Sequence, residues 1–116
     1  MRHHNRNKKL GRKRGGRRAL FKSLACSLIR DGQIKTTEVK AKQLKPFVEK
    51  LVTKAKTDTM ANRRFVMSSI GNKPQMTKLF TTVAKKYTDR KGGYVRIIKL
   101  PIRVSDGTKI AQIEFV

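Results

Sequence analysis

The sequence predicts an α+β fold: about four helices, a small sheet made of a C-terminal hairpin and a short strand near residue 35, and a basic extended N-terminal arm. Apolar residues recur with helical spacing between residues 19 and 87, whereas β-branched and aromatic residues gather after residue 93. The first sixteen residues show neither pattern. We therefore expect an arm over residues 1–16 and a single α+β domain over residues 17–116.

The predicted arm is strongly basic. Residues 1–18, MRHHNRNKKLGRKRGGRR, hold nine Lys or Arg, two His and no carboxylate. Low hydrophobicity combined with high net charge opposes folding, so residues 1–16 are expected to be disordered when free. A run of cations without acids is a poor solubility tail but a good ligand for a polyphosphate.

A first helix is predicted over residues 19–30, and Gly32 follows it as a C-terminal stop. Its leucines recur every four residues and form one apolar face: Leu20, Leu24 and Leu28. Cys26 lies on the opposite side of this helix. We interpret Cys26 as a small residue that permits close packing rather than as a reactive thiol.

A short β-prone stretch over residues 34–36 precedes Thr37, which is a good N-cap for a second helix over residues 38–56. The apolar residues of this helix share one face: Ala41, Leu44, Val48, Leu51, Val52 and Ala55. Pro46 removes one backbone hydrogen bond, so we expect a kink near Lys42.

A short third helix is predicted over residues 60–70, with Asp58 or Thr59 as its cap and Gly71 at its end. Pro74 suits the first turn of a fourth helix. The apolar residues of this helix have helical spacing and are interpreted as core: Met76, Leu79, Phe80, Val83, Ala84 and Tyr87.

Two strands are predicted at the C-terminal end, over residues 94–100 and 110–116. Ser105-Asp106-Gly107 is a turn signal between them, and Pro101 would fit only a bulge or an edge. An isolated hairpin is marginally stable, so this hairpin needs the strand near Ile34, the helices, or both.

The charge of the chain indicates a permanent anionic partner. The sequence has 30 Lys or Arg against 7 Asp or Glu, a formal net charge of +23. Such an imbalance destabilises a compact state unless an anion neutralises it. No apolar run approaches the ~20 residues needed to span a bilayer, and the single cysteine suits a reducing compartment. We expect nucleic acid in the cytoplasm, and no membrane partner.

No catalytic constellation is visible in the sequence. The seven carboxylates are scattered, and His3-His4 lack further ligands at the spacing that a metal site needs. Gly92-Gly93 has no phosphate-loop continuation, so it is either a simple turn or a place where the backbone approaches a phosphate. We expect no enzymatic activity, metal, cofactor or small-molecule substrate.

Four basic groups are candidates for contact with a polyanion. The first comprises the arm and the start of the first helix: Arg2, His3, His4, Arg6, Lys8, Lys9, Gly11, Arg12, Lys13, Arg14, Arg17, Arg18 and Lys22. The second comprises Lys35, Thr36, Thr37, Lys40 and Lys42, and the third Arg63 and Arg64. The fourth comprises Arg90, Lys91, Gly92, Gly93, Tyr94, Arg96 and Lys99. Cations on every element indicate a protein surrounded by phosphate on several sides.

Motifs along nearly the whole chain resemble one family, the bacterial large-subunit ribosomal protein seventeen. They are KLGR at 9–12, RRALFKSLACSLI at 17–29, IKTTEVKAKQLKPFVEKLVTKAKTD at 34–58, NRR at 62–64, KLF at 78–80, RKGGYVRIIK at 90–99 and the ending IAQIEFV. The resemblance implies a structural protein that binds large-subunit (23S) ribosomal RNA near the polypeptide exit side, beside neighbouring large-subunit proteins. It implies RNA contacts within all four groups, with Tyr94 and arginines as stacking candidates.

Two other functions remain open from the residues alone. An architectural DNA-binding or nucleoid protein would share the charge without the motifs. A small ribonuclease would need a histidine with an acidic partner. Aromatic residues are few, so sequence-specific base reading is expected to be minor.

Overall fold

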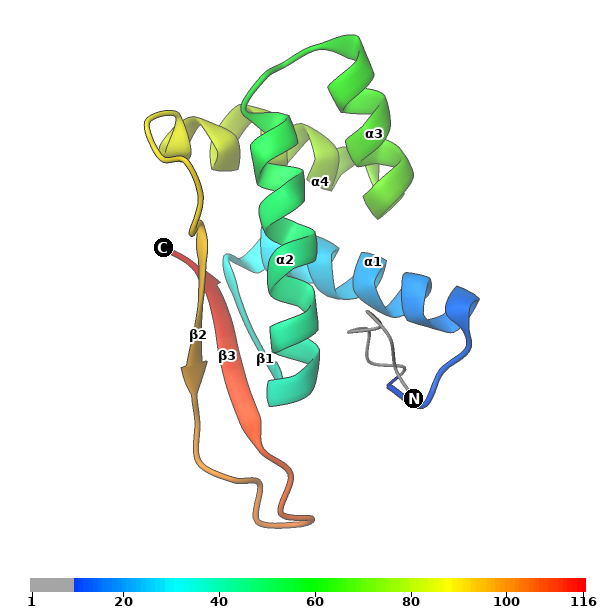
Figure 1. Ribbon diagram of the computed structural model, residues 1–116, viewed down its shortest axis with the longest axis vertical. Coiled ribbons are helices and arrows are strands. Elements are labelled where there is room, and N and C mark those ends of the chain that lie inside the picture. Colours follow the sequence, from blue (N-terminus) through cyan, green and yellow to red (C-terminus); the bar gives the residue numbers. More distant parts are fainter. Residues whose placement is uncertain (1–9) are drawn as a thin grey trace, which may run out of the picture.

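A computed structural model describes residues 10–116, and it confirms the predicted α+β fold (Figure 1). Its elements follow in the order α1 (Arg14–Asp31), β1 (Gln33–Thr37), α2 (Glu38–Ala55), α3 (Met60–Ile70), α4 (Lys73–Lys78), η1 (Leu79–Val83), η2 (Ala84–Tyr87), β2 (Val95–Lys99) and β3 (Ile110–Phe115). η1 is π-helical and η2 is a 3₁₀-helix.

Helix α1 begins earlier than the sequence pattern predicts. It starts at Arg14 instead of residue 19, and its first turn is closed by a 2.9 Å hydrogen bond from Arg17 N to Lys13 O. This turn is almost entirely exposed, so it has no apolar period by which the sequence could reveal it. The last three residues of the predicted arm are therefore helical. Residues 1–9 lie outside the described part, and the disorder of the free arm stays a prediction.

The end of α1 is confirmed at Gly32, whose φ of 81° lies in the left-handed region. Its N–H donates to Leu28 O at 2.7 Å, which satisfies one of the terminal carbonyls of the helix. A side chain with a Cβ would be strained in this conformation. The glycine thus turns the chain directly from α1 into β1.

Helix α2 is the central element, and its predicted cap and buried face are both confirmed. The hydroxyl of Thr37 accepts a 3.3 Å hydrogen bond from Lys40 N. All six predicted core residues are buried: Ala41, Leu44, Val48, Leu51, Val52 and Ala55. The helix continues through Pro46, and the expected kink near Lys42 stays a prediction.

Helices α3 and α4 also follow the sequence pattern. Thr59, rather than Asp58, caps α3 and accepts from Asn62 N at 3.2 Å. The predicted fourth helix is present but not uniform, since α4 passes into η1 and then η2. Its six predicted core residues are all buried: Met76, Leu79, Phe80, Val83, Ala84 and Tyr87.

The sheet is antiparallel with the strand order β1-β3-β2, so the C-terminal strand is central. Ile113 pairs with Ile34 on one side and with Ile97 on the other. The predicted hairpin and the third strand near residue 35 are confirmed. Helix α2 packs against all three strands (Figure 1). Along β3, buried residues alternate with partly exposed ones from Ile110 to Glu114, as expected for a strand with one face on the core.

The connection between β2 and β3 projects beyond the helical part of the molecule (Figure 1). Arg103 N donates to Thr108 O at 2.9 Å, and the Arg103 guanidinium binds the Asp106 carboxylate at 2.8 and 3.0 Å. The predicted turn at Ser105-Asp106-Gly107 lies at its tip. Pro101 lies in this loop just after β2, where it interrupts no strand pairing.

The position of Ile113 at the centre of the sheet gives a test of the core. Replacing Ile113, which is 0% exposed, by Ala is expected to lower the free energy of unfolding by about 2–5 kcal/mol, because it leaves a cavity. Urea denaturation would measure it. Ile98→Ala is the matched control on the outer face of β2, where the side chain is 40% exposed, and its loss is expected to be about 1 kcal/mol or less. Equal losses would contradict the assignment of the two faces.

Candidate nucleic-acid interface

The few carboxylates of the chain are almost all used in local ion pairs. Within residues 10–116, six of the seven acids contact a basic side chain at 4.0 Å or less. The pairs are Arg30–Asp31, Lys42–Glu38, Lys99–Glu38, Lys45–Glu49, Arg63–Asp58, Arg96–Glu114 and Arg103–Asp106. Most basic side chains of the described residues therefore have no carboxylate partner and remain available to an external anion.

Hydrogen bonds hold several of these carboxylates in their charged form. A hydrogen bond with Lys42 lowers the pKa of Glu38, and one with Arg63 lowers the pKa of Asp58. Hydrogen bonds from Arg103 and Thr108 hold the pKa of Asp106 far below its ordinary range. None of these carboxylates has the raised pKa that a general acid at neutral pH requires.

The first basic group is only partly described. Arg2, His3, His4, Arg6, Lys8 and Lys9 lie outside the described residues. Gly11 adopts a left-handed φ of 65° just before α1, and the guanidinium of Arg12 donates to Leu10 O at 2.8 Å. Along the first three turns of α1, basic side chains are exposed or half-buried: Arg14, Arg17, Arg18 and Lys22. Lys13 is the N-cap residue, without a side-chain capping bond.

The second basic group forms a concave surface at the start of α2. A depression of about 430 Å³ is lined by Lys35, Thr36, Thr37, Lys40, Ile110 and Arg103. The structure thus brings together four of the five predicted residues. Lys42 lies in a neighbouring depression and is bound to Glu38 at 2.9 Å.

Arg103 joins this cleft from the far side of the β2–β3 loop, and sequence reasoning missed it. It is 66 residues or more away from the β1 members in the chain, so only the fold brings it there. The turn signal at Ser105-Asp106-Gly107 showed that the chain reverses, but not where its side chains point.

The third group, Arg63 and Arg64, divides into two roles. Arg63 donates to Asp58 Oδ2 at 2.8 Å, and its guanidinium lies 5.3 Å from the centroid of the Phe80 ring. Arg63 therefore links α3 to η1 through Phe80, and to the loop before α3 through Asp58. Arg64 is exposed and makes no ion pair with a carboxylate of residues 10–116.

The prediction that Tyr94 stacks on RNA is wrong for the folded chain. Tyr94 is 1% exposed, and its ring packs against Tyr87 with centroids 5.3 Å apart. Its hydroxyl lies within hydrogen-bonding distance of Thr53 Oγ1 and Lys56 Nζ, at 3.4 and 3.2 Å, and donates to Arg90 O. Tyr94 belongs to the loop before β2 and packs against α2. A buried phenol needs polar partners, which Thr53, Lys56 and the backbone of Arg90 supply.

The remainder of the fourth group is largely structural as well. Gly93 has a φ of 62°, and its N–H donates to Glu49 Oε2 at 3.2 Å. Gly92-Gly93 thus forms a turn fixed to α2. Arg96 and Lys99 contact Glu114 and Glu38 at 3.2 and 3.8 Å. Within this group, Arg90 and Lys91 are exposed and have no carboxylate partner in residues 10–116.

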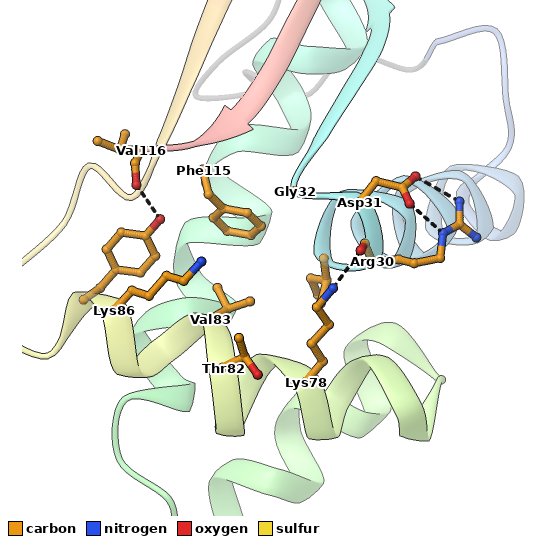
Figure 2. A pocket seen from close by; sticks show the side chains of 11 residues that line it. Arg30, Asp31, Gly32, Lys78, Thr82, Val83, Lys86, Phe115 and Val116 are labelled. Atoms are coloured by element: carbon orange, nitrogen blue, oxygen red, sulfur yellow. Dashed lines mark hydrogen bonds and ion pairs between the residues drawn. The ribbon is translucent and has the colours of Figure 1, made fainter.

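A second depression of about 430 Å³ lies between the end of α1, the η1–η2 segment and the C-terminal residues. Two hydrogen bonds join residues that line this depression (Figure 2): Lys78 Nζ donates to Arg30 O at 2.7 Å, and the Tyr87 hydroxyl donates to Val116 O at 2.8 Å. Lys78 thereby satisfies a terminal carbonyl of α1. Sequence reasoning did not identify this site, since its contacts join residues about 30 to 50 positions apart.

Cys26 packs as the sequence predicted. Its Sγ lies 3.5 Å from Ile70 O, so the small side chain lets α1 approach the end of α3 closely. Burial raises the pKa of the Cys26 thiol, which keeps it protonated at neutral pH. Within residues 10–116, no group of three or more His, Cys, Asp or Glu side chains could hold a metal ion.

Comparison with known proteins decides the family. The family described as ribosomal protein L17 matches residues 20–116. The chain belongs to this family. Relatives named large ribosomal subunit protein bL17 support the assignment. That of Sphingopyxis alaskensis is 52% identical over 116 residues, which cover 100% of this chain and 84% of the relative.

Two further relatives with the same name match the whole chain. That of Neorickettsia sennetsu is 44% identical over 117 residues and is covered completely, as is this chain. That of Flavobacterium johnsoniae is 48% identical over 116 residues, which cover 100% of this chain and 71% of the relative. The resemblance found in the motifs is thus confirmed, and the comparisons lend no support to a nucleoid protein.

The helices of the described residues were compared in length and apolar character with what a bilayer requires. None of those between residues 10 and 116 combines the length and the apolar character that crossing a bilayer requires.

The environment of Cys26 predicts slow alkylation. At pH 8 the folded chain should react with iodoacetamide at least about tenfold more slowly than free cysteine, because burial disfavours the thiolate. The rate should rise as the pH approaches and exceeds the ordinary thiol pKa. Mass spectrometry would follow the reaction, with urea-unfolded chain as the control. A folded chain that reacts as fast as the unfolded one would contradict this packing.

Proposed function

We propose that this chain is a structural component of the large ribosomal subunit that binds and organises large-subunit (23S) ribosomal RNA, without enzymatic activity. The observation that carries the proposal is the surplus of basic side chains without a carboxylate partner, spread over α1, α2, α3 and the sheet. Membership of a ribosomal protein family supports it, as do the names of the relatives.

The mechanism is neutralisation of phosphate from several sides. A protein that contacts many phosphates releases condensed counterions, which provides affinity without base recognition. The cleft of Lys35, Thr36, Lys40 and Arg103 suits a sugar–phosphate backbone, because ammonium groups and hydroxyls converge there in one concavity. The basic arm would add contacts and become ordered on the RNA.

The projecting β2–β3 loop suits a neighbouring large-subunit protein. Its Val104 side chain is 101% exposed and Ile102 is 56% exposed, so both would be covered in an assembly. The site of assembly that we propose is the cytoplasmic ribosome, near the polypeptide exit side. The proposal includes no cofactor, metal or small-molecule substrate.

Sedimentation tests the proposed function directly. A tagged chain expressed in a bacterium should co-migrate with large subunits in a sucrose gradient and remain there after a moderate salt wash. Salt weakens each phosphate contact, but a protein that makes many such contacts at once remains bound. Recovery with chromosomal DNA, or at the top of the gradient, would overturn the proposal. A chain of the same tag and similar size with balanced charge serves as the control.

The basic cleft gives a quantitative test of the phosphate contacts. Lys35→Ala combined with Lys40→Ala should weaken binding to a 23S rRNA fragment. The dependence of log K on log salt should become shallower by about 1.5, roughly 0.7–0.9 for each lost contact. Filter binding at several salt concentrations would measure both effects.

The control for this test is Lys85→Ala combined with Lys86→Ala. These lysines are exposed on η2, lie outside the proposed RNA-facing set and change the net charge equally. Their removal should leave the slope nearly unchanged. A slope that responds equally to both pairs would show that binding depends on net charge and not on this cleft.

A further inference from the structure

A cavity of about 310 Å³ lies between α1, α2 and α3, outside the basic cleft described above. It is lined by Arg18, Phe21, Lys22, Phe47, Ser68 and Ser69. Its volume falls at the lower end of small-ligand sites, about 300–1,000 Å³. Arg18 and Lys22 belong to the first predicted basic group, whereas neither phenylalanine was a candidate for contact with RNA.

Two stacked aromatic rings form part of its wall. The ring centroids of Phe21 and Phe47 are 6.1 Å apart, with 30° between the ring planes. Both side chains pack against the buried core and are only half-buried themselves, so each has surface left at the cavity. An aromatic surface of this kind accepts the flat face of a nucleobase, whatever the base.

The two cations at the cavity have no acidic partner. Neither Arg18 nor Lys22 takes part in an ion pair within residues 10–116. Lys22 Nζ lies near the end of α3, since a Cβ built on Gly71 would be 3.8 Å away from it. Aromatic faces beside unpaired cations are the arrangement by which proteins hold single-stranded nucleic acid.

The serines at the cavity offer acceptors. Ser68 Oγ and Ser69 Oγ each donate to Phe65 O at 3.0 Å, so their protons are already used. Their oxygens retain lone pairs, which can accept hydrogen bonds from a ligand. Amino groups on the edge of a base can donate these hydrogen bonds to the serine oxygens.

From these contacts we propose that the cavity receives one unpaired nucleobase of the bound RNA, stacked on Phe21 and Phe47. Arg18 and Lys22 contact the phosphates that flank this base, and the Ser68 and Ser69 oxygens accept from its edge. This site rests on the proposed function, because it requires that the chain binds RNA. It replaces the buried Tyr94 as the aromatic stacking site.

A comparison of two probes tests the site with the unaltered chain. One is a twelve-nucleotide single-stranded oligoadenylate, and the other is an abasic ribose–phosphate strand of the same length. The phosphates are the same in both, so their electrostatic contribution cancels. The intact strand should bind about tenfold more tightly, since base–aromatic stacking contributes that much or more. Equal binding of the two strands would overturn the proposal.

Variants then locate the base-dependent part of binding. Phe47→Leu and Phe21→Leu keep an apolar side chain at the core and remove the ring. Each should reduce the preference for the intact strand to below about threefold and leave the affinity for the abasic strand unchanged. Circular dichroism would confirm that each variant is folded.

Phe65→Leu is the matched control. Phe65 is also a half-buried ring on this part of the surface, but it lies outside the cavity. Lys50 Nζ and Lys54 Nζ lie 5.6 and 5.3 Å from its ring centroid and cover it. The variant should keep the tenfold preference. If Phe65→Leu reduced the preference for the intact strand as much as Phe47→Leu does, the proposed site would be overturned.

The outcomes separate this inference from the function on which it rests. If neither strand binds at physiological salt, the RNA-binding proposal fails and the site fails with it. If both strands bind equally well, only the nucleobase site fails, and phosphate contact remains the mode of binding. A preference removed by Phe47→Leu and retained by Phe65→Leu supports both.

Discussion

Mutual repulsion among the basic side chains is the constraint to which the rest of the structure responds. The chain carries 30 Lys or Arg and only 7 Asp or Glu. Six of these acids lie in ion pairs within residues 10–116. Exposed pairs of this kind each contribute little to stability. They cannot offset the remaining positive charge, so an external polyanion has to do so.

The buried core keeps its shape in spite of this charge because α2 connects every layer. Its apolar face contacts the sheet, α1, α3 and η1, and its polar sides carry lysines outward. The loop before β2 is fastened to the same helix through Tyr94 and Gly93. The basic groups consequently project from a fixed framework. Binding of RNA and stability of this framework are then linked, since a ligand that binds only the folded chain stabilises it.

The parts that the sequence predicted are those in which apolar spacing and burial coincide. The buried face of α2, the cap at Thr37 and the stop at Gly32 were all evident from residue order. The start of α1 at Arg14 was not, because an exposed turn has no apolar period. Tyr94 was read as a surface aromatic, since the sequence does not show that polar groups from α2 and its own loop surround its hydroxyl. Arg103 and the pair Phe21–Phe47 depended on tertiary contacts alone.

The two kinds of RNA contact that we propose would serve different purposes. The phosphate contacts that we propose at the cleft of Lys35 and Lys40 would provide affinity, but a uniform backbone cannot set the position of the protein along it. A cavity that admits one base does set that position, because most bases of a folded RNA are paired and cannot enter. The cleft lies at the start of α2, whereas Phe47 lies near its middle, so one rigid helix joins the two contacts. A structural protein of this size could in this way hold an RNA segment in a defined register without reading its sequence.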